Sequence, residues 1–387
     1  MCASGSHGEV KTRGVDVIDL RSDTLTVPSQ SMLRAMFASA VGDDCFGEDP
    51  TTNHLEEYCA DLFGKQAAIF NPTGTMSNQI ALRLHTHPGD DVILDQSYHF
   101  NIYESAPSAD LAGVALTTVK TSDGVLTPEN VAAAIDGKCH GGRYYQATLV
   151  TLENTINYRA GRVVPLQALQ RVSEFARREG MSLHLDGARI FNAIVASGTP
   201  PRAYGSVVDT LSVCFAKGLG APFGSILVGP ADLIERARCY RKAYGGALHQ
   251  CGHLAGAALY ALQHNVARLA DDHAAARYLA ELLAEIPLLA MGLNEVQSNI
   301  VIVDLRPSGL PADTVTAAAK LHGLLLMPIS QHRIRFVTHA AITMSDVSAA
   351  ARILNQVLKE NCPGLGKRSN HRFGANATAV SGALSSH

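Results

Sequence analysis

Met181-Ser-Leu-His-Leu-Asp-Gly-Ala-Arg-Ile190 is the stretch around which the rest of the chain can be interpreted. Its leucines alternate with polar residues as in a short strand, which ends at Asp186 and a glycine. A second run, Leu211-Ser-Val-Cys-Phe-Ala216, alternates in the same way and leads directly to Lys217. In an open α/β sheet, ligands bind beyond the carboxyl ends of the strands. The two runs therefore predict a ligand site at which a carboxylate and an amine are delivered by strand ends.

An aspartate and a lysine are also the side chains that a protein contributes to pyridoxal phosphate chemistry. The carboxylate keeps the pyridinium nitrogen protonated, and the lysine can form a Schiff base with the cofactor. Taken singly, an aspartate at a strand end and a lysine after a strand are more often simply exposed to solvent. Asp186 and Lys217 therefore indicate this cofactor only if the chain also supplies a phosphate site.

A third strand end supplies such a candidate. Gln66-Ala-Ala-Ile-Phe70 has the composition of a buried strand, Asn71-Pro-Thr-Gly-Thr-Met-Ser-Asn78 follows it, and a helix is predicted over 77–86. Free backbone N–H groups and the positive end of a helix dipole attract anions at such a turn. A glycine–threonine turn alone usually only caps a helix. Upstream of the aspartate and the lysine, it predicts that Gly74 and Thr75 bind a phosphate group.

Strands and helices alternate over roughly residues 66–230. Val92-Ile-Leu-Asp95 is another predicted strand, and His99 lies just past its end, in line with the other candidates, although a lone histidine is more often structural. The run over 147–154 also ends in polar residues, and a crossover helix is predicted over 164–179. This alternation predicts an α/β fold with a doubly wound, mainly parallel sheet that is covered on both faces.

The pattern changes after about residue 235, where a basic segment over 236–246 includes Lys242. An Ala/Leu-rich stretch over 254–288 predicts one long connecting helix into a smaller α+β domain. The predicted elements of that domain are strands and helices over 300–305, 312–322, 333–337 and 345–359. Arg335 alternates with two apolar neighbours and could present its guanidinium to a carboxylate. The alternative is a surface arginine on an edge strand.

Four segments follow from these patterns. We expect a mobile leader over 1–15, a large domain over 16–250, a connector helix with a small C-terminal domain over 251–360, and a disordered tail over 361–387.

Composition limits the function classes. The chain has 387 residues, 47% of them apolar and 17% charged, with a net charge of −3, so neither nucleic acid nor an anionic membrane is an expected partner. Eight cysteines include no Cys-x-x-Cys pair, which favours reduced thiols. No apolar stretch approaches the roughly 18 residues of a membrane span. The first twenty residues lack a signal-peptide core. We expect a cytoplasmic protein and leave a mitochondrial address open.

The segment Gly42-Asp-Asp-Cys-Phe-Gly-Glu-Asp-Pro50 is dense in acid and glycine. A carboxylate-rich loop of this kind could bind calcium. It lacks the spacing of an EF-hand, so a solvated turn is the preferred interpretation and no metal is expected.

Six motifs stand in order between about Val17 and Leu358. They are Asp19-Leu-Arg-Ser-Asp-Thr24, Val41-Gly-Asp-Asp-Cys-Phe-Gly-Glu-Asp-Pro50, Pro72-Thr-Gly-Thr-Met-Ser-Asn78, His184-Leu-Asp-Gly-Ala-Arg-Ile-Phe-Asn192, Ala216-Lys-Gly-Leu-Gly-Ala-Pro-Phe-Gly-Ser225 and Arg335-Phe-Val-Thr-His339. Together they resemble the low-specificity L-threonine aldolases. The resemblance implies the aspartate-aminotransferase-type fold (fold type I), bound pyridoxal phosphate, and a homotetramer built from dimers.

The resemblance also implies a role for each matching residue. Lys217 falls on the lysine that carries the cofactor, Asp186 on the partner of the pyridine nitrogen, and His99 on the histidine stacked on the ring. Gly74 and Thr75 match the phosphate-binding turn.

Three further matches hold the substrate carboxylate: Ser22, Arg189 and Arg335. Arg189 and Lys242 are also expected to bind the cofactor, and Lys242 lies on a segment that in the family reaches a neighbouring subunit's site.

The implied reaction is the retro-aldol cleavage of L-threonine or L-allo-threonine to glycine and acetaldehyde, in threonine breakdown and glycine formation. A base must take the β-hydroxyl proton. His99, directly or through water, is the preferred candidate, and Glu104 is a further one. Two other readings stay open: a related fold-type-I lyase, acting by β-elimination or like serine hydroxymethyltransferase, and an inactive homologue that only binds the cofactor.

Three positions depart from the family's pattern. Phe46 stands where tyrosine is common, Ile156 stands where histidine is usual, and His249 stands where arginine is common. None of the three is among the residues matched above, so we expect the protein to be active. The missing arginine at position 249 is the departure expected to weaken binding of the cofactor phosphate.

Overall fold

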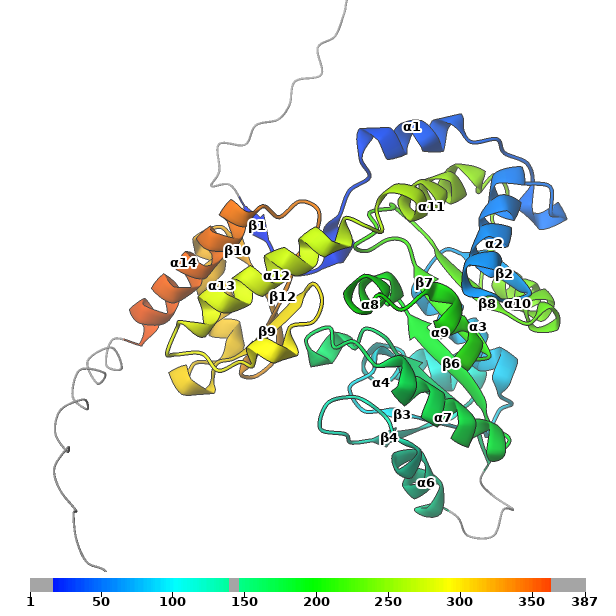
Figure 1. The fold of residues 1–387 in the computed structure, drawn as a ribbon, viewed down its shortest axis with the longest axis horizontal. Helices are drawn as coiled ribbons and strands as arrows, with labels where there is room; N and C mark the ends of the chain where they lie inside the picture. Colours follow the sequence, from blue (N-terminus) through cyan, green and yellow to red (C-terminus); the bar gives the residue numbers. More distant parts are fainter. Residues whose placement is uncertain (1–16, 139–145, 363–387) are drawn as a thin grey trace, which may run out of the picture.

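The computed structural model describes residues 17–138 and 146–362 (Figure 1). The expected leader over 1–15 lies outside these ranges, and so does nearly all of the expected tail over 361–387.

A seven-stranded sheet forms the centre of the larger part of the molecule (Figure 1). In chain order its strands are β2 (Ala67–Asn71), β3 (Asp91–Asp95), β4 (Ala115–Val119), β5 (Ala147–Glu153), β6 (Ser182–Gly187), β7 (Thr210–Cys214) and β8 (Ser225–Gly229). Their order in the sheet is β2-β8-β7-β6-β5-β3-β4. β8 runs antiparallel to both neighbours, and the other neighbouring pairs are parallel. The predicted α/β fold with a mainly parallel sheet is therefore confirmed.

Helices cover both faces of this sheet. They are α2 (Pro50–Phe63), α3 (Gly74–His85), α4 (His99–Tyr103), α5 (Ser105–Pro107), α6 (Pro128–Asp136), α7 (Leu166–Arg178), α8 (Ile190–Ser197), α9 (Pro201–Val207) and α10 (Ala231–Ala243). Side chains of a strand alternate between the two faces. Along β2, Ile69 packs in one core with residues of α3 and α10, whereas Ala68 and Phe70 pack in the other core with residues of α2.

Local signals explain where these helices begin and end. The carboxylate of Asp49 accepts a hydrogen bond from the N–H of Thr52 at 2.9 Å and caps α2, whose first residue is Pro50. α2 ends at Gly64, where a φ of 66° favours glycine. α3 begins three residues earlier than predicted, because the Thr73 hydroxyl caps it by accepting from the N–H of Met76 at 3.1 Å.

The C-terminal part holds a three-stranded antiparallel sheet. Its strands are β9 (Ile300–Asp304), β11 (Met327–Ser330) and β12 (Arg333–Val337), in the order β11-β12-β9. Its helices are α12 (Leu269–Ala284), α13 (Ala312–Leu321) and α14 (Met344–Asn361). Arg335 lies on the middle strand and is 5% exposed, so the alternative of a surface arginine on an edge strand is wrong.

The single long helix predicted over 254–288 is also wrong, because the stretch forms α11 (Gly252–His264) and then α12. The turn between them is fixed by the loop that carries Lys217. The Asn265 side chain donates to the carbonyl of Leu219 at 2.7 Å, and the Arg268 guanidinium donates to the carbonyl of Gly218 at 2.9 Å. The break therefore ties the connector helices to the candidate site.

The N-terminal segment belongs to both parts of the molecule. β1 (Ile18–Asp19) pairs in parallel with β10 (Leu324–Leu325), and Ile18 and Leu20 are buried in the C-terminal core. The chain then crosses to α1 (Gln30–Ala38), which packs against α11 in the larger part (Figure 1). The division into domains at residue 250 stays a prediction.

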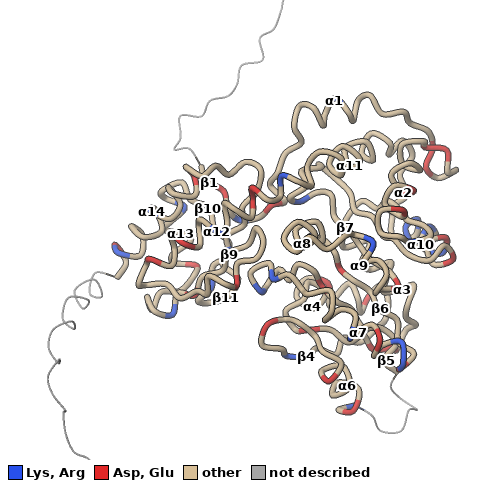
Figure 2. The backbone as a smooth tube through the Cα atoms, viewed as in Figure 1, with Lys and Arg blue, Asp and Glu red and all other residues tan. Residues whose placement is uncertain are grey.

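Three further features of the described residues bear on what the composition predicts. Figure 2 shows acidic and basic residues interspersed along the described chain. Within the same ranges, none of the helices combines the length and apolar character needed to span a bilayer. Cys2 and Cys139 lie outside those ranges, and the others are free thiols, as expected: Cys45, Cys59, Cys214, Cys239, Cys251 and Cys362.

Candidate active site

The carboxyl ends of three adjacent parallel strands meet at one small cavity. Glu153 at the end of β5 pairs in register with Asp186 on β6, which pairs with Ser212 on β7. The cavity has a volume of about 150 Å³. Six of the predicted site residues line it: Gly74, Thr75, His99, Asp186, Arg189 and Lys217. The three predicted residues that are not in its lining are Ser22, Lys242 and Arg335.

Asp186 is buried and held in one orientation by protein donors. One carboxylate oxygen accepts from the Asn78 side chain at 3.0 Å, and the other accepts from the N–H of Ala188 at 3.0 Å. Burial alone would raise the pKa of Asp186, but the nearby charges of His99 and Lys217 lower it below its usual range. Asp186 is therefore an anion aimed at the cavity, as a partner for a protonated ring nitrogen must be.

Lys217 follows β7 and lines the same cavity. Its backbone is fixed, because the carbonyl of Lys217 accepts from the Thr26 hydroxyl at 2.8 Å and from the N–H of Gly220 at 2.8 Å. Within the described ranges its amine has no hydrogen bond or ion pair with another side chain. A positioned lysine with a free amine is what covalent attachment of an aldehyde requires.

The turn before α3 offers backbone donors to an anion. The first N–H groups of a helix have no partner within the helix, and the helix dipole adds positive potential there. Gly74 and Thr75 are the first two residues of α3, and both line the cavity. This arrangement suits a phosphate group.

His99 is oriented by a buried carboxylate. Its Nδ1 lies 2.8 Å from an oxygen of Glu104, which is 1% exposed. Burial tends to lower the pKa of His99, but the hydrogen bond to Glu104 and the charge of Asp186 raise it above its usual value. Glu104 also accepts from the side chains of Asn78 at 2.9 Å and Gln79 at 2.8 Å. Glu104 is therefore engaged on every side and orients His99, which makes it a poor candidate for a free base.

Glu153 lines the cavity although the sequence did not single it out as a site residue. Its two oxygens accept from the backbone N–H groups of His99 at 2.6 Å and Asn157 at 2.8 Å. Burial and the charge of Asp186 raise the pKa of Glu153 to about 7. The one signal in the sequence was the polar end of the strand over 147–154, which gives no pKa. A carboxyl group that titrates near neutral pH is suited to proton transfer.

Arg189 is buried at the cavity and is held by Asp23. The guanidinium donates to the two oxygens of Asp23 at 2.8 and 2.6 Å, and Asp23 is fully buried. Burial would raise the pKa of Asp23, but the charge of Arg189 holds it well below its usual range. Asp23 also accepts from the Asn299 side chain at 3.2 Å, so it connects Arg189 to the C-terminal part. The motif over 19–24 contained Asp23, but only its partner reveals this role.

Arg335 lies outside the cavity lining. Burial and the charge of Arg189 lower the pKa of Arg335 below its usual value. Arg335 donates to the side-chain oxygen of Asn157 at 2.8 Å and to the carbonyl of Arg21 at 3.1 Å. Ser22 directly follows Arg21, whose carbonyl accepts this hydrogen bond from Arg335. The Ser22 hydroxyl itself accepts a hydrogen bond from the N–H of Thr24 at 3.2 Å. Roles for Ser22, Arg189 and Arg335 at a substrate carboxylate stay predictions.

Lys242 and two of the unusual positions lie away from the cavity. Lys242, in the last turn of α10, is exposed, as are Phe46 and His249, whereas Ile156 is fully buried. The exposure of Lys242 is compatible with a role at another subunit's site. That role stays a prediction, because the structure contains a single chain.

The acidic loop over 42–50 uses its carboxylates internally. Asp44 forms a buried ion pair with Arg241 at 2.6 Å, and Asp49 caps α2. Asp43 caps a short turn by accepting from the N–H of Cys45 at 2.8 Å. Three of the loop's carboxylates thus have partners within the protein, and the absence of a metal there stays a prediction.

Comparison with known proteins gives this site a family. The family model of beta-eliminating lyases matches residues 19–306. The chain belongs to the beta-eliminating lyase family. Within it, the chain is 40% identical over 346 residues to low-specificity L-threonine aldolase 1 of Arabidopsis thaliana, covering 88% of this chain and 96% of that protein. The low specificity L-threonine aldolase of Escherichia coli (strain K12) is 40% identical over 338 residues, 87% and 97% of the two chains.

Solved structures confirm the fold of this beta-eliminating lyase. The threonine aldolase of Leishmania major superposes with a TM-score of 0.74 at 20% identity, covering 88% of this chain and 99% of that chain. A structure described as SPT with PLP superposes with a TM-score of 0.68 at 19% identity, covering 90% and 89%. The expectation of fold type I and the resemblance to low-specificity L-threonine aldolases are both confirmed.

The protein is therefore a lyase that uses pyridoxal phosphate. The residues present fit this cofactor, because a buried anionic Asp186 faces the cavity together with the Lys217 amine and the donors at Gly74 and Thr75, which have no partners among the described residues.

Proposed function

We propose that the protein cleaves L-threonine and L-allo-threonine to glycine and acetaldehyde, in threonine breakdown and glycine formation. The observation that carries this proposal is the convergence of Lys217 and Asp186 on a cavity that Arg189 also lines. The sequence relatives named L-threonine aldolases support the choice of substrate.

Each cavity residue has a separate task towards the cofactor. Lys217 would hold it covalently, Asp186 would hold the proton on its ring nitrogen, and the N–H groups of Gly74 and Thr75 would bind its phosphate. Bound pyridoxal phosphate supplies an acceptor for the electron pair released at the substrate Cα.

The arginines would select which bond breaks. A carboxylate fixed by Arg189 and Arg335 restricts rotation about the substrate's Cα and presents one bond for cleavage. Arg189 is pre-positioned by Asp23, and Arg335 by Asn157. Both guanidinium groups are therefore rigid before a substrate arrives, which lowers the entropic cost of binding it.

A base must take the β-hydroxyl proton. His99 stays a candidate, because Glu104 raises its proton affinity. Glu153 is a second candidate, because it lies in the cavity lining and its pKa is raised to about 7, where a carboxylate can accept a proton near neutral pH.

Glu153→Gln is expected to change the pH dependence of the reaction. The base must be ionised, so in the wild type kcat/KM should fall about tenfold per pH unit as the pH drops below the pKa of Glu153. In the variant this acidic limb should disappear, and kcat should fall by about 10²–10⁴-fold. Glu104→Gln is the matched control, because it removes another buried carboxylate but should keep the limb. An acidic limb that persists in Glu153→Gln would exclude Glu153 as the base.

The reaction itself is tested by recording the absorbance of the purified protein before and after adding L-threonine or L-allo-threonine. A coupled reductase reports acetaldehyde. A band that shifts, together with aldehyde formation, is the expected result. A shift with pyruvate and ammonia in place of aldehyde would favour a β-eliminating enzyme. A cofactor band without turnover of either amino acid would favour an inactive homologue.

A homotetramer built from dimers, with a cytoplasmic location, completes the proposal. The N-terminal arm, residues 24–46, supports the assembly because it exposes large apolar side chains. Val27, Phe37 and Phe46 are 80%, 82% and 78% exposed. Apolar side chains that are this exposed in one subunit can be covered by another, and we infer that a second copy of the chain covers them here. The free cysteines suit a reducing compartment.

Phe37→Glu is expected to lower the oligomeric mass measured by light scattering after size exclusion, because a charge in an apolar interface is not solvated. Leu321→Glu is the control, since Leu321 is 84% exposed on α13 in the other part of the molecule. An unchanged mass for Phe37→Glu would remove the N-terminal arm from the interface.

A further inference from the structure

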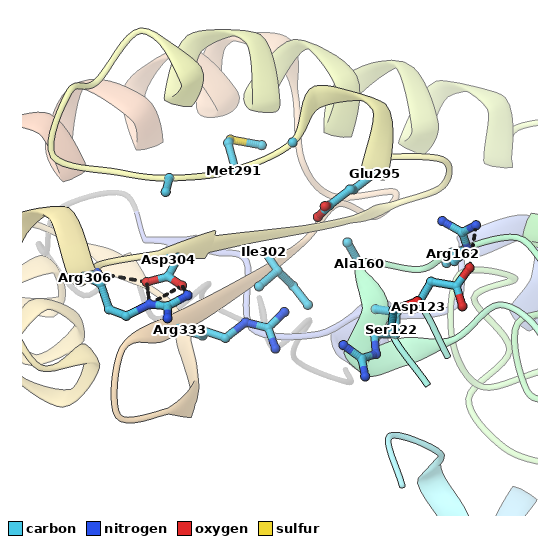
Figure 3. Close-up of a pocket in the computed structure, with 13 residues that line it drawn as sticks. Ser122, Asp123, Ala160, Arg162, Met291, Glu295, Ile302, Asp304, Arg306 and Arg333 are labelled. Carbon is cyan, nitrogen blue, oxygen red and sulfur yellow. Dashed lines mark hydrogen bonds and ion pairs between the residues drawn. The ribbon is translucent and has the colours of Figure 1, made fainter. Parts of the chain in front are cut away.

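A second, larger cavity lies between the two parts of the molecule, away from the lysine. Its volume is about 550 Å³, and Figure 3 shows its lining. Ile302 and Arg333 come from the C-terminal sheet, and Met291 and Glu295 follow Ala290, which pairs with Asp304 at the end of β9. The Asp304–Arg306 pair closes one end, and the segments around Ser122 and Ala160 from the larger part close the other. We call this cavity the arginine pocket.

Four arginines line the arginine pocket, and two of them already have carboxylate partners. Arg162 pairs with Asp123 at 2.9 Å, and Arg306 forms several hydrogen bonds with Asp304. The positive charges of Arg162 and Arg306 are therefore largely neutralised by their own partners and contribute little to binding a ligand.

The other two arginines have no such partner. Over residues 17–138 and 146–362, neither Arg159 nor Arg333 has a carboxylate within ion-pair distance. Arg159 donates to the carbonyl of Thr121 at 3.1 Å, and its Nε is buried without a hydrogen bond. Arg333 has no hydrogen bond from its side chain within those ranges. Burial and the charge of Arg159 lower the pKa of Arg333, and the charges of Asp304 and Glu295 offset this only in part.

Unpaired, partly buried guanidinium groups are costly unless an anion compensates them. Glu295 also lines the pocket, but it is exposed and forms no ion pair within the described residues, so the lining keeps one excess positive charge. Each guanidinium offers a planar fork of donors that matches a carboxylate or a phosphate. A ligand with two anionic groups could therefore satisfy both arginines at once.

The turn that carries Arg159 is held in an unusual conformation. Ala160 has a φ of 52° and Gly161 a φ of 64°, and both lie in the left-handed region. A left-handed conformation costs a residue with a Cβ roughly 1–2 kcal/mol. Ala160 is nevertheless 4% exposed, because it packs against Ile302 of the C-terminal sheet. The packing that fixes this turn thus also fixes Arg159 at the pocket wall.

The arginine pocket and the active site share structural elements. Arg333 and Arg335 lie two residues apart on β12, so their side chains leave the same face of the sheet. Arg159 follows Asn157 by two residues, and Asn157 accepts the hydrogen bond from Arg335. A ligand that bridges Arg159 and Arg333 would therefore hold together the two elements that position Arg335.

We propose that the arginine pocket binds a small organic polyanion, carrying carboxylate or phosphate groups, through Arg159 and Arg333, and that this binding changes the KM for the amino-acid substrate. The effect on KM rests on the proposed function. Binding of the polyanion can be tested without any turnover.

Binding is measured by calorimetry on the protein loaded with pyridoxal phosphate, at constant ionic strength. Succinate serves as the carboxylate probe and pyrophosphate as the phosphate probe, and the probe that binds identifies the anionic group. Arg159→Gln and Arg333→Gln should each weaken the affinity by about tenfold or more, because each removes one charged partner. Arg306→Gln is the matched control and should bind within about threefold of the wild type, since Arg306 is already paired.

Two results would overturn the site. One is that neither probe binds to the wild type. The other is that both variants bind as tightly as the wild type, which would assign the anion to the active site. Thermal unfolding shows whether each variant is folded, and Arg159→Gln provides an independent reading if Arg333→Gln is unstable.

The regulatory half is tested by measuring KM with and without a saturating amount of the probe that binds. A change in KM of about threefold or more is expected in the wild type and in Arg306→Gln, and none in Arg333→Gln. Binding without any change in KM would overturn the regulatory half and leave the site.

Discussion

Lys217→Ala is expected to abolish the long-wavelength absorbance of the bound cofactor and nearly all turnover. The amine of Lys217 lines the same cavity as Asp186 and has no partner in the part of the chain that the structure describes, and an alanine cannot attach to an aldehyde. Turnover should fall by roughly 10³–10⁶-fold, the range found when a nucleophile or a proton-transfer group is removed. Single-turnover assays and an absorbance spectrum after dialysis against pyridoxal phosphate measure both effects.

Lys217→Arg separates covalent attachment from charge. The arginine keeps a cation near Asp186, but its guanidinium stays protonated and is not nucleophilic. The Lys217→Arg variant should therefore be as inactive as Lys217→Ala. Activity within about tenfold of the wild type in either variant would show that Lys217 does not carry the cofactor.

Both variants should remain folded. The side chain of Lys217 makes no ion pair within the described residues, and its backbone contacts do not depend on the side chain. Lys217→Ala removes one of the charges that hold Asp186 ionised, so a loss of stability of roughly 0.5–3 kcal/mol is expected, and a smaller one for Lys217→Arg, which keeps a cation there. A cooperative thermal unfolding curve is the required control for the loss of activity.

Much of the fold could be predicted because its strands are short, apolar and regularly spaced. The alternation around Leu183 and Leu211 fixed two strands of the sheet, and their polar ends fixed one edge as the site. The direction of β8 could not be predicted, since hydrophobic periodicity is the same in parallel and antiparallel strands. The break between α11 and α12 was equally hidden. It contains no glycine or proline and depends on hydrogen bonds to the distant loop after Lys217.

The site shows the same division between local and distant information. Strand ends and the family resemblance brought together Lys217, Asp186 and the phosphate turn. Glu153 and Asn78 were missed as site residues, because what marks them is spatial. Glu153 acquires its pKa from burial beside Asp186, and Asn78 bridges Asp186 and Glu104. A sequence can place a carboxylate at the end of a strand, but it cannot show which charge faces it.

Neighbouring arginines illustrate why the two parts of the molecule must be considered together. The charge of Arg189 acts on Arg335 and that of Arg159 acts on Arg333, and over residues 17–138 and 146–362 only Arg189 of these four is paired with a carboxylate. In the two proposals above, anions relieve this repulsion: a substrate carboxylate at Arg189 and Arg335, and a second polyanion in the arginine pocket. The N-terminal segment controls the paired member through Asp23.

Asp23→Ala is expected to be strongly destabilising as well as damaging to activity. Removing one partner of a buried ion pair leaves the other charge uncompensated, and costs about 3–5 kcal/mol. Here Arg189 would stay buried without Asp23, and the link from Asp23 to Asn299 in the C-terminal part would be lost as well. Because Arg189 would also lose its fixed orientation, KM for threonine should rise. Denaturant unfolding and steady-state kinetics measure the two effects.

Asp19→Ala is the matched control for Asp23→Ala. Asp19 lies four residues earlier in the same segment and pairs with Arg21, whose side chain is 48% exposed. An exposed pair contributes about 0–1 kcal/mol, so this variant should unfold nearly as the wild type does. An equal loss in the free energy of unfolding in the two variants would mean that the buried Asp23–Arg189 pair stabilises the fold no more than the exposed Asp19–Arg21 pair does.

The pH dependence of the stability difference gives an independent test. The pKa of Asp23 is lower in the folded protein than in the unfolded chain, so its pair stabilises the fold above the unfolded pKa of about 3.9. As the pH falls below that value, the unfolded chain binds the proton first and the stabilisation is progressively lost. The difference in the free energy of unfolding between wild type and Asp23→Ala should therefore be constant from about pH 5 to 7 and narrow below about pH 4. A difference that stays constant through acid pH would show that the loss comes from packing rather than from the charge of Asp23.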